Sequence, residues 1–135
     1  MPEHDAAALN GAFPIVPYDD PRAAIGWLAR TFGGVATEVH PADPAEPLQH
    51  AEVRVGTGIV MLSDAGRAGG SAFALPGPVA VYVVVEDPDG LHDRAVAAGA
   101  DIVMGLQDQP YGSREFAVRD DHGNVWSFGT YRPAA

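Results

Sequence analysis

Apolar and polar positions follow the same order of patterns twice along the chain. An apolar stretch at 12–18 runs into Asp20-Pro21, and a second one at 79–85 runs into the same dipeptide 67 residues later. Apolar residues then recur every three or four positions, which is the spacing of a helix. Proline suits the first helical turn because its missing N–H has no partner to lose there. Each occurrence therefore predicts a strand followed by a helix.

The two predicted helices end at glycines, and three extended stretches follow each of them. The helices are expected at 22–32 and 89–98, before Gly33 and Gly99, because glycine adopts the left-handed conformation that ends many helices. Alternation of apolar and polar residues predicts the strands that follow, at 36–40, 49–55, 58–63, 101–106, 114–119 and 124–130. The unit is β-α-β-β-β, and the predicted fold is α+β with a mixed, mostly antiparallel sheet in each copy.

This repeat divides the chain into two modules. The expected boundaries are an N-terminal tail at 1–10, a first βαβββ module at 11–63, a linker at 64–78, a second module at 79–131 and a C-terminal tail at 132–135. The linker is rich in Gly, Ala, Ser and Pro, a composition typical of connecting segments.

Strand alternation assigns one face of each sheet to the helix that covers it. In 49–55 the small and β-branched residues share one side, whereas His50, Glu52 and Arg54 share the other. Four large aromatic residues are expected in the core: Trp27, Phe32, Trp126 and Phe128. Two curled sheets with their mixed faces turned inward would form a cup, and a concave site lined by apolar and a few polar groups is typical of ligand binding.

Composition excludes several classes of function. The chain has no cysteine, which excludes disulfides, thiolate nucleophiles and zinc–thiolate sites, and no lysine, which excludes Schiff-base chemistry and a phosphate-loop lysine. The formal charge of −10 opposes nucleic-acid binding and favours cationic small molecules. No apolar run reaches the ~20 residues that a membrane helix needs, and the acidic N-terminus is unlike a secretory signal. A cytoplasmic location, without nucleic-acid or membrane partners, is expected.

One segment carries a resemblance to a known family. Residues 108–124 read DQPYGSREFAVRDDHGN. This is similar to the C-terminal signature of bleomycin resistance proteins, with Tyr111 where that family often has Trp and Asp121 where it has Pro. Together with the repeated unit, it resembles the vicinal oxygen chelate superfamily, which includes glyoxalase I, extradiol dioxygenases and fosfomycin-resistance enzymes. The resemblance covers 11–131 and implies the cup-shaped fold of that superfamily.

The resemblance also addresses metal binding. It implies that the ligand positions of the metalloenzymes fall here on Phe13, Met61, Ala80 and Ser127. None of these is an imidazole or carboxylate, the groups that divalent metals prefer. The sequence therefore predicts no metal and no cofactor. His50 and Glu52, two positions apart on one face of a strand, could chelate an ion. The alternative is that they form a polar lining or a salt bridge to Arg54.

The other histidines carry weaker signals. His92 is expected on the solvent side of the second helix, and His122 is expected to be structural in a hairpin turn. His40 borders a loop and has no predicted role.

The predicted site is a cup that holds a small organic molecule. Eight residues are expected to line it or its rim: Phe13, His50, Glu52, Met61, Tyr82, Tyr111, Glu115 and Ser127. Two functions remain open. The first is a metal-free protein that sequesters a planar or cationic, antibiotic-like compound, as the resemblance implies. The second is a glyoxalase-like enzyme that uses histidine and glutamate of the cup as acid–base groups or as an atypical metal site. A homodimer is expected, because an isolated module exposes its mixed face and sheet edges.

Overall fold

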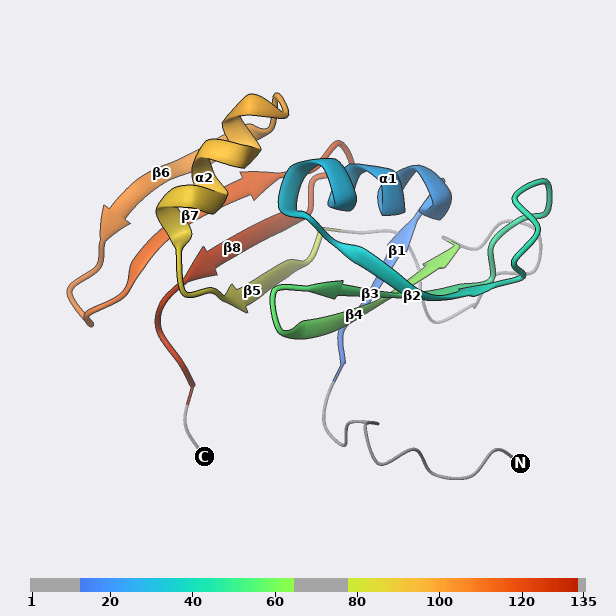
Figure 1. Cartoon of the computed structure of the whole chain (residues 1–135), viewed down its shortest axis with the longest axis horizontal. Helices are drawn as coiled ribbons and strands as arrows, with labels where there is room; N and C mark the ends of the chain where they lie inside the picture. The colour runs from blue at the N-terminus through green and yellow to red at the C-terminus, as the bar shows by residue number, and fades with distance from the viewer. Residues whose placement is uncertain (1–12, 65–77, 134–135) are drawn as a thin grey trace.

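The computed structural model describes residues 13–64 and 78–133 (Figure 1). The predicted N-terminal tail and most of the predicted linker lie outside the described residues. The first module comprises β1 (Ile15–Tyr18), α1 (Pro21–Phe32), β2 (Val35–His40), β3 (His50–Val55) and β4 (Gly58–Asp64). The second comprises β5 (Ala80–Val84), α2 (Pro88–Ala97), β6 (Asp101–Asp108), β7 (Arg114–Arg119) and β8 (Val125–Gly129).

Each module forms a four-stranded sheet with one parallel pair. The strand orders are β1-β4-β3-β2 and β5-β8-β7-β6. β1 runs parallel to β4 and β5 runs parallel to β8, whereas the other neighbours are antiparallel. The β-α-β-β-β order of elements in each module and the mixed, mostly antiparallel sheets confirm the predicted fold class.

Both helices begin as the sequence predicts. The carboxylate of Asp20 accepts a hydrogen bond from the backbone N–H of Ala23, and Asp87 caps α2 in the same way. α1 ends at Gly33, whose φ of 70° is the left-handed conformation that favours glycine. Within the described residues, neither helix is long and apolar enough to cross a bilayer.

The first strand is shorter than expected. The pattern predicts a strand from residue 12, but β1 starts at Ile15, after Pro14. The carbonyl of Pro14 accepts a hydrogen bond from the N–H of Met61, and the residue beside Met61 in the parallel ladder is Ile15. Phe13 therefore precedes the strand, and Ile15 occupies the position on β1 that faces the same side as Met61.

The two modules share one core. In Figure 1 both helices lie on the same side of the two sheets, and α1 contacts α2. Phe32, at the end of α1, packs its ring 4.4 Å from that of Phe128 and 6.2 Å from that of Trp126, both on β8 of the other module. Phe128 and Trp126 are fully buried and Phe32 is 6% exposed, so the prediction that they form the core is confirmed for these three. Trp27, the fourth predicted core aromatic, is only partly buried and packs against the core.

A buried carboxylate makes a second joint between the modules. Asp120, after β7, accepts hydrogen bonds from the hydroxyl of Tyr18 on β1 at 2.8 Å, from the indole N–H of Trp126 and from Asn124. It also accepts the backbone N–H of His122. A buried charge is tolerated where hydrogen bonds satisfy it, so this residue ties the end of β1 to the β7–β8 turn.

Candidate functional site

Burial of alternate residues in the strands agrees with the faces that the sequence predicts. Ala51, Val53 and Val55 of β3 are buried on the helix side, and Phe116 and Val118 of β7 are fully buried on the equivalent side. The opposite side of each sheet, here called the open face, carries the mixed residues.

The eight predicted site residues divide between two open faces. Those of the first module are His50 and Glu52 on β3 and Met61 on β4, with Phe13 just before β1. Those of the second module are Tyr82 on β5, Glu115 on β7, Ser127 on β8 and Tyr111 in the β6–β7 turn. Because the two sheets lie side by side with both helices on one side (Figure 1), one chain does not turn these two faces toward each other.

On the second module, three side chains converge over one glycine. A Cβ placed on Gly129 would lie 2.6 Å from Cγ of Glu115, 2.7 Å from the hydroxyl of Tyr82 and 2.9 Å from Oγ of Ser113. These distances are shorter than ordinary contacts, so only glycine leaves room for this arrangement. The absence of a side chain at the end of β8 therefore brings a carboxylate and a phenol together.

One tyrosine binds this carboxylate, and two further tyrosines are linked to it by a ring contact and a hydrogen bond. The hydroxyl of Tyr111 donates a hydrogen bond of 2.8 Å to Glu115, and that hydrogen bond, followed by desolvation and the nearby negative charge, raises the pKa of Tyr111. The hydroxyl of Tyr82 donates to the carbonyl of Tyr131 at 2.7 Å. The rings of Tyr111 and Tyr131 meet edge to face at 5.8 Å. We call Tyr82, Tyr111, Glu115 and Tyr131 the tyrosine–glutamate site.

A tight turn delivers Tyr111 to this site. The N–H of Gln109 donates to the carbonyl of Ser113, and the N–H of Gly112 donates to the carbonyl of Gln109. Pro110 follows Gln109, where its fixed φ favours a turn, and Gly112 takes a φ of 85° that favours glycine. The sequence QPYG thus places the tyrosine ring at the tip of the turn, where its side chain is 58% exposed.

The carboxylate of this site has no cationic partner among the described residues. Glu115 is only 6% exposed. The neighbouring Arg114 points to the opposite side of β7, where its guanidinium binds Asp89 at 2.7 Å and Asp108 at 3.2 Å. That pairing holds the pKa of Asp89 below its ordinary value. A buried carboxylate without a cation is a costly group unless something neutralises it.

An apolar groove borders the tyrosine–glutamate site. It has a volume of about 290 Å³ and lies where the start of β4 approaches β5. Phe13 and Ile59 line it from the first module, and Tyr82 and Val84 line it from the second. Tyr82 therefore belongs both to this groove and to the tyrosine–glutamate site. Of the eight predicted residues, Phe13 and Tyr82 are the two that this groove brings together.

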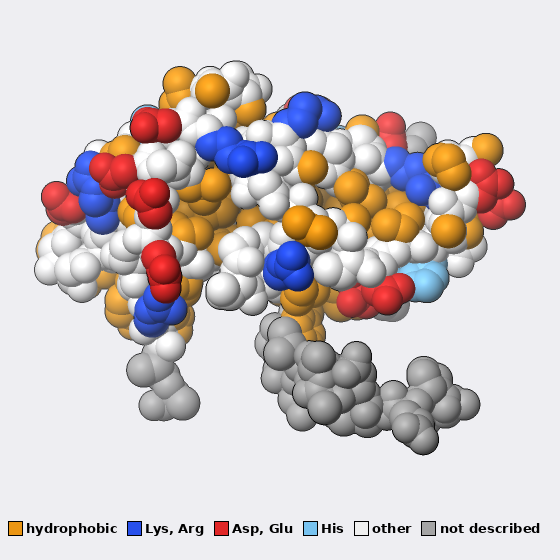
Figure 2. All heavy atoms as spheres, viewed as in Figure 1, with side chains coloured by type: hydrophobic (Ala, Val, Ile, Leu, Met, Phe, Trp, Pro, Cys, Tyr) orange, Lys and Arg blue, Asp and Glu red, His pale blue; other side chains and the backbone are white. Residues whose placement is uncertain are grey.

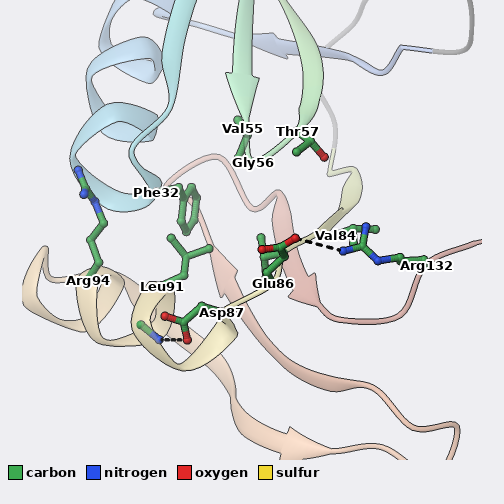
Figure 3. A pocket seen from close by; sticks show the side chains of 12 residues that line it. Phe32, Val55, Gly56, Thr57, Val84, Glu86, Asp87, Leu91, Arg94 and Arg132 are labelled. Atoms are coloured by element: carbon green, nitrogen blue, oxygen red, sulfur yellow. Dashed lines mark hydrogen bonds and ion pairs between the residues drawn. The ribbon is translucent and has the colours of Figure 1, made fainter.

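A larger hollow lies at the seam between the modules, beside the end of α1. Its volume is about 500 Å³, and Phe32, Val55 and Leu91 form its apolar wall (Figure 3). Its charged groups already have protein partners, since Arg132 lies 3.8 Å from Glu86. The guanidinium of Arg94 donates to the carbonyl of Ala29 at the C-terminal end of α1. The hollow therefore offers less for ligand recognition than the buried acid of the open face.

Comparison with known protein families gives a match across most of the chain. The model of the glyoxalase/bleomycin resistance protein/dioxygenase superfamily matches residues 11–128. The chain belongs to this superfamily. This confirms the predicted resemblance at the level of the superfamily, whereas the bleomycin-resistance-like subgroup remains a prediction.

Several known proteins are similar to this superfamily member over most of its length. It is 34% identical over 134 residues to the uncharacterized protein MT0910 of Mycobacterium tuberculosis, covering 93% of this chain and 78% of that protein. The crystal structure of TioX from Micromonospora sp. ML1 is 37% identical with a TM-score of 0.76, covering 90% of this chain and all of the other. Lactoylglutathione lyase from Agrobacterium tumefaciens, at 20% identity and a TM-score of 0.65, covers 93% of this chain and 94% of its own and shows the same fold.

The strand positions at which the resemblance implies metal ligands do not fit a divalent ion in this superfamily member. The resemblance places these positions on Phe13, Met61, Ala80 and Ser127. Strand pairing corrects two of them, because Ile15 and not Phe13 stands beside Met61, and Tyr82 and not Ala80 stands beside Ser127. The paired set is therefore Ile15, Met61, Tyr82 and Ser127. These four side chains offer no imidazole and no carboxylate, which divalent metals prefer. Within 13–64 and 78–133, one set of three histidine or acidic residues has ligand atoms within 4.8 Å of one another, and it lies on the β7–β8 turn at 120–122.

Sequence reasoning missed one residue of the site, Tyr131, and the neighbouring Ser113, and it misplaced a histidine. Tyr131 and Ser113 are absent from the predicted set, although alternation from Ser127 through Gly129 points Tyr131 to the open face. His92 is not a solvent-side residue as predicted. Its side chain is 22% exposed and meets the ring of Phe116 edge on at 5.3 Å, because α2 packs that side against β7.

Proposed function

We propose that this superfamily member binds and sequesters a small planar or cationic organic compound without using a metal. The observation that carries this proposal is Glu115, a buried carboxylate beneath tyrosines that no cation of the described residues neutralises. A cationic group of a ligand would supply the missing charge. Sequestration requires no catalytic residue, which agrees with the lack of metal-type side chains at the paired strand positions.

The surroundings of Glu115 favour a ligand that is flat and amphipathic. Aromatic rings offer stacking and cation–π contacts, which are stronger where the cation is desolvated. The apolar groove that shares Tyr82 would accept the hydrophobic part of the ligand. Burial of apolar area, at roughly 25 cal/mol per Å², would supply most of the affinity, and Glu115 would select for positive charge.

A homodimer would complete the site. We propose that the open face of the first module in one chain covers the tyrosine–glutamate site of a second copy. The open faces expose apolar and aromatic groups that a partner would cover, since Ile15 is 42% exposed and Tyr131 is 48% exposed. This arrangement would bring His50, Glu52 and Met61 to the ligand. A monomer mass by sedimentation equilibrium at micromolar concentration would refute it.

The test of ligand binding uses planar aromatic cations and uncharged molecules of the same shape. Thermal-shift measurements select the best cation, and calorimetry then compares the wild type with variants. Glu115→Gln should weaken the cation roughly tenfold or more, about 1.4 kcal/mol, and the uncharged analogue much less. Tyr111→Ala should weaken both. Asp121→Asn, which removes a carboxylate that is 92% exposed and distant from the site, is the matched control and should change neither.

The outcomes separate this proposal from its alternative. Equal binding to all three variants would overturn the assignment of the site. Loss of binding after treatment with EDTA would overturn the metal-free state. The alternative is acid–base catalysis by Glu115, which the hydrogen bond from Tyr111 favours because it links a carboxylate to a phenol that could relay a proton. Conversion of the bound compound, followed by mass spectrometry, would establish that alternative.

A further inference from the structure

Two histidines and two glutamates lie in register on the open face of the first module. In the antiparallel pairing of β2 with β3, His40 stands opposite His50 and Glu38 stands opposite Glu52. A bulge between Ala36 and Glu38 shifts the register and sets both pairs. Each strand therefore presents a histidine and a glutamate two residues apart, and the two strands present them side by side.

The side chains form two parallel pairs. Nε2 of His40 lies 3.1 Å from a carboxylate oxygen of Glu38, and Nε2 of His50 lies 3.0 Å from one of Glu52. The two imidazole rings are 6.1 Å apart, with planes only 20° from parallel. Their side chains are accessible, from 34% exposed for His50 to 62% for His40. Figure 2 shows acidic and histidine side chains together at the lower edge of this module.

The glutamates on this face have histidine partners and no arginine partner among the described residues. Like charges directly opposite each other on neighbouring strands are unfavourable. Within the described residues, neither Glu38 nor Glu52 forms an ion pair with an arginine. With neutral imidazoles the four side chains carry two negative charges, which one divalent cation would balance. Neutral imidazole and carboxylate together are donors that suit zinc, nickel and copper better than magnesium or calcium.

We propose that Glu38, His40, His50 and Glu52 form a binding site for a divalent transition-metal ion, with the two imidazoles as its main ligands. Ligands two residues apart on one strand point the same way, and the opposite strand places the second imidazole with its ring centroid 6.1 Å from the first. Each exposed ring would turn its Nε2 from its own glutamate toward the shared ion. This site lies on β2 and β3 and not on the strands where the resemblance implies metal ligands.

The group on the β7–β8 turn is the competing candidate, and its contacts argue against it. The carboxylate of Asp120 is buried and already accepts hydrogen bonds from Tyr18, Trp126 and Asn124. Binding a metal there would break the joint between the modules. Binding a metal at β2 and β3 would break only the exposed contacts of His40 with Glu38 and of His50 with Glu52.

The experiment titrates the untagged full-length chain with Zn²⁺ alone, in a buffer that does not chelate metals, by calorimetry. One ion per chain is expected for the wild type. His40→Ala and His50→Ala should each weaken binding by at least the ~10–100-fold typical of losing an outer-sphere partner, and Glu38→Gln with Glu52→Gln should weaken it less. His122→Ala is the matched control and should leave the affinity unchanged. Circular dichroism should show that every variant is folded.

A second measurement locates the ion directly. Substoichiometric Ni²⁺ should broaden the backbone amide signals of 38–40 and 50–52 in a nitrogen–proton correlation spectrum before any others. Absence of Zn²⁺ binding would overturn the proposal. Loss of binding in His122→Ala with retention in His40→Ala would also overturn it, as would broadening centred on 120–122. Planar cations are not used in these titrations, so failure of Zn²⁺ binding is distinguishable from failure of the test on Glu115, although His50 and Glu52 would also approach the ligand in the proposed homodimer.

Discussion

The two modules have the same hydrogen-bonded frame but different chemistry on their open faces. Ala51 pairs with Leu62 in the first module, and Phe116 pairs with Phe128 in the second, so the two pairs are equivalent. His50 directly precedes Ala51 and Glu115 directly precedes Phe116, so His50 and Glu115 occupy equivalent positions. On the last strand of each module, Ser63 follows Leu62 and Gly129 follows Phe128, so Ser63 and Gly129 are also equivalent. Loss of that side chain allows Glu115 to lie buried under tyrosines, whereas the side chain of His50 stays 34% exposed.

This difference shows how a repeated fold can carry different side chains at equivalent positions. Substitutions at a few positions of the open face change a solvated cluster of histidine and glutamate into a buried carboxylate with aromatic walls. On the helix side, both modules contribute to one core around Phe32 and Phe128. The open faces therefore carry the specific chemistry, and the shared core holds them in place.

The largest expected effect tests whether two such different modules still unfold together. Phe32→Ala removes a ring that packs against β8 of the other module, so we expect the free energy of unfolding to fall by about 3–5 kcal/mol. Denaturation by urea, followed by fluorescence, should remain one transition. Val35→Ala, at a side chain that is 46% exposed, is the control and should change stability by less than about 0.5 kcal/mol. Two separate transitions in the wild type would contradict a shared core.

The second effect concerns the polar joint and has a defined pH dependence. Tyr18→Phe removes a hydrogen bond to the buried Asp120 and should cost about 1.5–3 kcal/mol. Burial, then the charge of Asp120, raises the pKa of Tyr18 above its ordinary value of 10.0. The folded state thus retains a proton that the unfolded state releases, so the stabilisation is complete below about pH 10 and is lost as the pH rises above it.

Urea denaturation between about pH 8 and 11, a range that spans the ordinary tyrosine pKa near 10, tests the direction of this pH dependence. The wild type should lose stability toward the upper limit, and Tyr18→Phe should lose less. Equal slopes for the two proteins would show that Tyr18 does not carry the effect.

The third prediction concerns Gly129, the residue that leaves room for Glu115 on the open face of the second module. Gly129→Ala would place a methyl group against Glu115, Tyr82 and Ser113, so we expect a loss of about 1–3 kcal/mol from overpacking. Binding of the planar cation should weaken as well. Gly105→Ala is the matched control, because no atom lies within 4 Å of its added Cβ, and it should be nearly neutral. Identical behaviour of the two variants would contradict the convergence over Gly129.

The smallest effect concerns the equivalent position of the first module. Oγ of Ser63 is buried and has no hydrogen-bond partner within the part of the chain that the structure describes. Ser63→Ala should therefore leave stability unchanged or raise it by up to about 1 kcal/mol, since an unsatisfied polar group is removed. A loss of more than about 1 kcal/mol in thermal or urea unfolding would show that this hydroxyl has a partner.

Much of the fold follows from local sequence patterns. The two Asp-Pro dipeptides, the glycines after the helices and the strand alternation predict every element to within a few residues. They also predict that Glu115 and Tyr82 face the open side. These signals succeed because helix caps, turns and pleats depend on residues close in sequence. The same patterns place Phe13 within a strand, whereas pairing with β4 leaves it outside.

What the sequence determined by itself is the repeated unit, the buried face of each sheet and the acidic, cysteine-free composition. Only the tertiary structure decided which residues meet. It joined Tyr131 to Ser113, joined Tyr18 to Asp120, and set His40 opposite His50 through a bulge. Alternation fixes the direction of a side chain, but it does not fix the register between strands. Register and packing depend on contacts between residues that are distant along the chain.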